Sequence, residues 1–195
     1  MTSKIKQIGS GFNTKLIPYE DLDSLPISIC HSRHMPEEPT SFVWQQFSSD
    51  PNMDSPSHHA RFARHLYKYY PILVDNVLSF LETCIDINIH RSKVSIATNT
   101  GCLLPHTDPP FVNTRINIGL LNSSTSTLLI GDNNNKEDFA KSSESFIIEE
   151  GNAYLLNTRL VHSVAPSKPK FIGLSRYLIT ISFQENYAEM LKRVL

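Results

Sequence analysis

Two potential metal ligands stand two residues apart, His106 and Asp108, at the end of the short run Leu103–Pro105. Because side chains alternate along an extended segment, an imidazole and a carboxylate at this spacing point to the same side. A third ligand can come from a distant strand, and His162 opens a suitable apolar run. Two imidazoles and one carboxylate on one face of a metal leave the other positions open to reactants, as at non-haem Fe(II) sites. These three residues therefore predict a metal site.

The spacing alone is a weak signal, because a histidine and an aspartate two residues apart often occur by chance. The alternative is that His106 and Asp108 only cap a turn and that His162 is an ordinary residue at a strand end. The surrounding elements must decide between these interpretations.

Two predicted strands carry polar residues on one face only. In the segment 176–183 the side chains of Arg176 and Thr180 share a face, whereas Ile179 and Ile181 share the other. In the segment 115–121, Arg115 and Asn117 alternate in the same way with isoleucines and leucine. We expect the apolar faces to pack against helices and the polar faces to point into one cavity.

A buried arginine in such a cavity can bind a carboxylate through a two-pronged charge-assisted contact. Arg176 is the first candidate for anchoring a dicarboxylate. Arg115 is its rival for that anchor, or binds an acidic group of the substrate. The alternative for each arginine is a solvent-facing position on its strand.

The rest of the chain supplies the frame. Short apolar runs separated by Gly, Asn, Pro and Ser predict an all-β sandwich or barrel. The predicted strands are 5–8, 87–90, 93–98, 103–106, 115–121, 127–130, 145–148, 153–157, 161–164 and 176–183, and residues 15–17 form another short extended run. The apolar spacing from Ser55–Pro56 to about Cys84 predicts the main helical segment, interrupted near Pro71. A last helix is expected over 187–194.

Composition narrows the classes of function. The 195 residues allow one domain with a real core, and the net charge is -1 with scattered Lys and Arg, so nucleic acid is not favoured as a partner. No apolar run has the length of a signal peptide or a membrane span, which favours a cytoplasmic protein and no membrane partner. Three cysteines without CxxC pairing argue against a disulfide framework or a zinc-thiolate site.

The order of these motifs resembles the Fe(II)- and 2-oxoglutarate-dependent dioxygenases. The resemblance rests on His-Thr-Asp at 106–108, Leu-Leu-Asn-Thr-Arg-Leu-Val-His at 155–162 and Ser-Arg-Tyr-Leu-Ile-Thr-Ile-Ser-Phe at 175–183, and it covers about residues 93–183. It is nearest to small bacterial or viral members, including the aspartyl/asparaginyl and prolyl hydroxylase-like groups.

The fold that this resemblance implies is mainly β with supporting helices: a double-stranded β-helix, or cupin-like jelly roll. Residues 1–195 then form a single domain. Its parts are N-terminal strands, a loop and supporting helices over 1–86, the double-stranded β-helix core over 87–185 and a C-terminal helix over 186–195.

The resemblance also implies residue roles. His106, Asp108 and His162 would hold Fe(II), and Arg176 would pair with the distal carboxylate of 2-oxoglutarate. Further candidates for lining the cofactor pocket are Arg115, Asn117, Asn99, Thr100 and Trp44.

The implied activity is hydroxylation of an unactivated C–H bond of an amino acid-like small molecule or a peptidyl substrate, with molecular oxygen consumed and succinate and carbon dioxide as coproducts. A carboxylate at position 108 favours hydroxylation over halogenation. The separation of His162 and Arg176 is longer than is usual in the family, and a hairpin containing Pro166 and Pro169 accounts for the difference.

Two other functions are compatible with these residues. A cupin-like jelly-roll metal protein could isomerise or bind a ligand without using 2-oxoglutarate. A purely structural β-sandwich with accidental histidines would bind no Fe(II) tightly. The two arginines favour the oxygenase, because a binding module has no need for both in its cavity.

Overall fold

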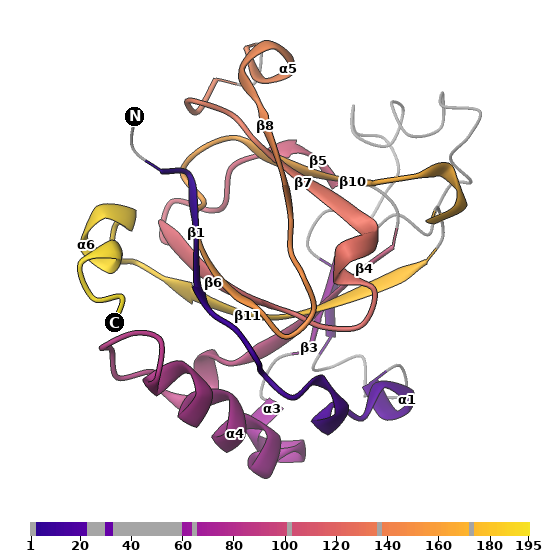
Figure 1. Cartoon of the computed structure of the whole chain (residues 1–195), viewed down its shortest axis with the longest axis vertical. Helices are drawn as coiled ribbons and strands as arrows, with labels where there is room; N and C mark the ends of the chain where they lie inside the picture. The colour runs from indigo at the N-terminus through magenta and orange to yellow at the C-terminus, as the bar shows by residue number, and fades with distance from the viewer. Residues whose placement is uncertain are drawn as a thin grey trace.

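The computed structural model describes residues 3–22, 30–32, 60–63, 66–100, 103–135, 138–171 and 174–195. Its strands form two antiparallel sheets (Figure 1). The seven-stranded sheet has the order β1-β9-β6-β11-β4-β3-β2, and the four-stranded sheet has the order β5-β10-β7-β8. The strands are β1 (Ile5–Gly9), β2 (Cys30–Ser32), β3 (Ala60–Ala63), β4 (Ser95–Thr100), β5 (Leu103–His106), β6 (Thr114–Gly119), β7 (Ser126–Ile130), β8 (Glu144–Ile147), β9 (Ala153–Asn157), β10 (His162–Pro166) and β11 (Ser175–Phe183).

The chain crosses repeatedly between the two sheets from β4 to β11. Strands β4, β6, β9 and β11 lie in the larger sheet, and β5, β7, β8 and β10 lie in the smaller one. Two four-stranded layers connected in this way make a jelly roll, also called a double-stranded β-helix. The fold class predicted from the sequence is therefore correct.

Helices cover the outer face of the larger sheet. Figure 1 shows α1 (Tyr19–Leu22), α3 (Leu66–Tyr69) and α4 (Pro71–Glu82) below β6 and β11, with β7 and β10 on the opposite side. Helix α4 begins with Pro71 at its first position, where a missing N–H costs nothing. Its buried residues Leu73, Val77 and Leu81 belong to one cluster with the outward-facing residues of the sheet. Two further short helices among the described residues are α5 (Phe139–Ser142) and α6 (Tyr187–Leu191).

A second hydrophobic cluster fills part of the space between the two sheets. Its buried members come from both layers: Leu128, Ile130, Ile148, Tyr154, Leu156, Val164 and Leu178. Strand β11 therefore serves both clusters, with Ile179 and Ile181 facing the helices and Leu178 facing the interior. This is the alternation that the sequence predicts, and it sends Arg176 and Thr180 inward.

Three details differ from the prediction. Residues 60–63 are not helical but form β3, where Arg61 and Phe62 pair with Thr98 and Ala97 of β4. Pairing with the edge of the sheet outweighs the helical spacing of the apolar residues. Residues 87–90 are not a strand. Residues 14–16 form a 3-10 turn capped by Asn13 rather than an extended run. The predicted helix start at Ser55 lies outside the described residues, whereas the interruption at Pro71 is confirmed.

Within the parts of the chain that the structure describes, no helix has the length and apolar character needed to cross a membrane.

Candidate metal site and cavity

Strands β5 and β10 bring the two predicted histidine ligands together. The strands are antiparallel neighbours, and His162 is the direct partner of His106 in their register. The two imidazole centroids are 4.4 Å apart, and the rings are inclined by 53°. Two residues 56 positions apart in the chain thus become one side of a metal site.

Asp108 lies just beyond the end of β5, where the backbone is held in place. Its N–H donates to the carbonyl of Thr158 at 3.2 Å, and the N–H of Thr158 donates to the carbonyl of Asn113 at 3.2 Å. The loop between β9 and β10 therefore fixes the segment that follows β5. The Asp108 side chain is almost completely buried.

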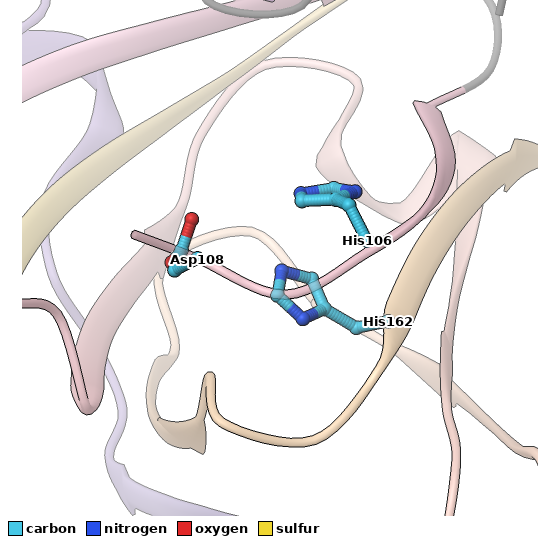
Figure 2. A group of neighbouring side chains, drawn as sticks. All are labelled: His106, Asp108 and His162. Carbon is cyan, nitrogen blue, oxygen red and sulfur yellow. The ribbon is translucent and has the colours of Figure 1, made fainter. Parts of the chain in front are cut away.

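The three side chains converge on one point. One ligand atom from each of His106, Asp108 and His162 lies within 4.8 Å of the others, and Figure 2 shows the three groups facing one another. A metal bonded to each ligand at about 2.1 Å requires these atoms to lie within about 4.2 Å of one another. The 4.8 Å spread of the three ligand atoms exceeds this limit by about 0.6 Å, and the donor set of two imidazoles and one carboxylate is that of a non-haem iron centre.

One histidine already has the tautomer that metal binding needs. His162 Nδ1 lies 2.9 Å from the carbonyl oxygen of Leu160. A carbonyl only accepts hydrogen bonds, so Nδ1 carries a proton, and in the neutral ring the lone pair is then on Nε2. Such a contact to the second ring nitrogen orients a ligating imidazole and raises its basicity.

Arg115 of β6 binds the carboxylate of the triad. Its Nη2 lies 2.6 Å from Asp108 Oδ2, and both side chains are nearly excluded from solvent. This ion pair joins the larger sheet to the segment that follows β5. Arg115 is therefore not solvent-facing, and its guanidinium lies at the metal end of the cavity.

A cavity extends from the triad between the two sheets. Much of its wall is aliphatic, including Leu103, Leu128, Ile148, Leu156, Val164 and Leu178, and its polar lining includes Arg115, Asn117, Thr180 and Arg176. In the register of β6 and β11, Ser182 is opposite Arg115, and Thr180 is opposite Asn117. Arg176 is six residues beyond Ser182, or about 20 Å along the strand. The two arginines therefore enter the cavity from opposite ends.

Arg176 is a buried cation at the end of the cavity remote from the triad. Its side chain is 5% exposed. Burial lowers the pKa of its guanidinium from the usual value to about 10, so the group remains charged at neutral pH. A buried cation of this kind is suited to hold an anionic group.

Two adjacent uncharged residues of the cavity wall each bury a polar atom that has no hydrogen bond among the described residues. Asn117 Oδ1 and Thr180 Oγ1 are buried without a hydrogen bond, and their residues are direct neighbours across β6 and β11. Burying such groups unsatisfied costs about 1 to 3 kcal/mol each. Both atoms are available to a ligand that enters the cavity.

The structure thus places His106, Asp108, His162, Arg115, Asn117 and Arg176 around one cavity. Asn99 pairs with Arg176 through the backbone of β4, and Trp44 lies outside the described residues. Thr180 lines the cavity but is not among the site residues predicted from the sequence. Its position on the same strand face as Arg176 could have indicated it.

Solved structures with this fold are numerous. The ribosomal oxygenase YcfD from Escherichia coli matches with a TM-score of 0.50 and 11% identity, over 96% of this chain and 49% of that one. From nogalamycin biosynthesis, the non-haem α-ketoglutarate-dependent carbocyclase SnoK matches with a TM-score of 0.47 and 11% identity, over 66% of this chain and 65% of that one. The α-ketoglutarate-dependent epimerase SnoN, from the same biosynthesis, matches with a TM-score of 0.44 and 8% identity, over 66% of this chain and 63% of that one. No protein-family model and no curated protein matches the chain.

The likeness to YcfD supports the double-stranded β-helix found above. The chain spans only about half to two thirds of the length of these three proteins. The chain thus shares its fold with a known oxygenase, and its own residues His106, Asp108 and His162 form the cluster that the sequence predicts.

Proposed function

We propose that the chain is an Fe(II)- and 2-oxoglutarate-dependent oxygenase that hydroxylates an unactivated C–H bond of an amino acid-like small molecule or a peptidyl substrate. One observation carries the proposal: the cavity has a two-histidine, one-carboxylate cluster at one end and the buried cation Arg176 at the other. A short dicarboxylate that chelates a metal through one end and needs a cation at the other fits these two features.

The cavity residues have separate roles in this proposal. His106, His162 and Asp108 hold Fe(II) on one face, and the contact from Leu160 keeps the His162 ring oriented. Arg176 binds the distal carboxylate of 2-oxoglutarate. Thr180 and Asn117 offer their unpaired polar atoms to the same ligand, and the aliphatic wall excludes water from it.

When bound, the iron supplies the oxidising chemistry, in which molecular oxygen is consumed and 2-oxoglutarate is converted to succinate and carbon dioxide. The aspartate at position 108 gives the site a third protein ligand, which favours hydroxylation over halogenation. The apolar wall keeps the reacting groups away from solvent.

Binding of the keto acid is the direct test. Calorimetric titration of the Mn(II)-loaded protein with 2-oxoglutarate should give tight binding, and Arg176→Gln should weaken it at least thirtyfold, because about 2 to 5 kcal/mol is lost when one partner of a buried charge pair is removed. Arg159→Gln is the matched control, since Arg159 is an exposed arginine of the loop between β9 and β10. Equal binding by wild type and Arg176→Gln would contradict the proposal, and metal binding without 2-oxoglutarate binding would favour the cupin-like alternative.

A further inference from the structure

The contact between Arg115 and Asp108 separates the roles of the two cavity arginines. Arg115 Nη2 lies 2.6 Å from Asp108 Oδ2 in a nearly dry environment, where a charge pair is stronger than at the surface. Arg176, by contrast, enters the cavity some six residues away along β11, measured from the residue opposite Arg115. Arg115 is thus already paired with a metal ligand, whereas Arg176 is placed for the far end of a dicarboxylate.

The ion pair also bears on the metal cluster. Oδ2 of Asp108 lies against the guanidinium of Arg115, and one oxygen of the same carboxylate belongs to the cluster with His106 and His162. We propose that Arg115 is a positioning residue that holds the Asp108 carboxylate in the orientation in which it ligates a metal. This inference rests on the metal site of the proposed function.

The pairing also preserves the geometry of the site before metal arrives. Asp108 is 3% exposed, and a carboxylate buried to this degree needs a partner. Arg115 comes from the rigid, fully paired strand β6, between β9 and β11. The strand therefore fixes the guanidinium, and the guanidinium fixes the carboxylate. Outer contacts of this kind typically change metal affinity by about 10- to 100-fold when they are removed.

The test is a Co(II) titration of the metal-free protein without any keto acid, followed by its visible absorption spectrum. Arg115→Gln removes the charge, and we expect at least tenfold weaker Co(II) binding and a changed spectrum, because Asp108 loses the contact that orients it. Arg176→Gln is the matched variant, which removes a buried arginine of the same cavity away from the metal. We expect it to leave Co(II) affinity and spectrum unaltered.

Circular dichroism reports whether each variant folds. If Arg115→Gln does not fold, Arg115→Lys takes its place, since it keeps a cation but replaces the planar guanidinium that lies against Asp108, and a change of spectrum is again expected. Wild-type Co(II) affinity and spectrum in a folded Arg115 variant would overturn this inference and leave the proposed function standing. Absence of Co(II) binding by the wild type would overturn both.

Discussion

The two faces of β6 and β11 contrast sharply although they belong to the same strands. On the outer face, Ile116, Ile118, Ile179 and Ile181 are fully buried in the cluster shared with helix α4. The inner face carries Arg115, Asn117, Thr180 and Arg176, and the side chains of Asn117 and Thr180 each bury a polar atom without a hydrogen bond among the described residues. Consecutive residues of each strand therefore alternate between side chains that stabilise the fold and side chains that line the cavity.

The contrast between the two faces shows which residues stabilise the fold. The outer face removes aliphatic surface from water, which contributes about 25 cal/mol for each Å² buried. The inner face buries charges and orphaned polar atoms, which opposes folding. The helix-backed face must therefore offset the cost of the cavity, and substitutions on the two faces should act on different measurements.

The largest expected effect is on metal binding. His162→Ala removes one of three ligands, and we expect Mn(II) affinity to fall more than 100-fold while the circular dichroism spectrum is retained. The exposed His90, which caps a 3-10 turn, provides the control His90→Ala. Metal binding by His162→Ala at wild-type strength would show that the cluster is not the metal site.

The outer face should control stability alone. Ile179→Ala creates a cavity in the core beside α4, and we expect the free energy of unfolding in urea to fall by about 2 to 5 kcal/mol. Metal affinity in the folded variant should stay within twofold of wild type, because the change points away from the triad. A large loss of metal affinity together with unchanged stability would reverse the comparison.

Thr180, the next residue on β11, should affect ligand affinity rather than stability. The expected effect is the smallest of the three. Thr180→Val removes an unpaired buried hydroxyl at nearly constant shape, so stability should stay unchanged or rise by up to about 1 kcal/mol. Affinity for 2-oxoglutarate should fall about two- to tenfold, which corresponds to the loss of one hydrogen bond of about 0.5 to 1.5 kcal/mol. Urea unfolding and calorimetry measure the two quantities. Lower stability with unchanged affinity would show that Thr180 serves the fold.

Local patterns in the sequence predicted the elements that position the site. The limits of β5 and β9 agree with the prediction residue for residue, and the alternation along β11 placed Arg176 inside. Period-two patterning is a property of a few neighbouring residues, which is why it can be recognised without the tertiary structure.

Contacts between distant elements could not be predicted in the same way. The pairing of Arg115 with Asp108 depends on how two sheets face each other, and the sequence left Arg115 and Arg176 as rivals for one role. Strand β3 was missed because its partner β4 lies more than thirty residues away and competes with helical spacing. The orphaned state of Thr180 is visible only once the cavity exists.

The most direct test of the account is an anaerobic titration of the metal-free protein with Fe(II) and then with 2-oxoglutarate, monitored for the weak visible charge-transfer band of a keto acid chelated to iron. We expect the band to appear in the wild type and to be absent in His162→Ala. Iron binding without the band would contradict the assignment of 2-oxoglutarate, and absence of iron binding would contradict the metal site itself.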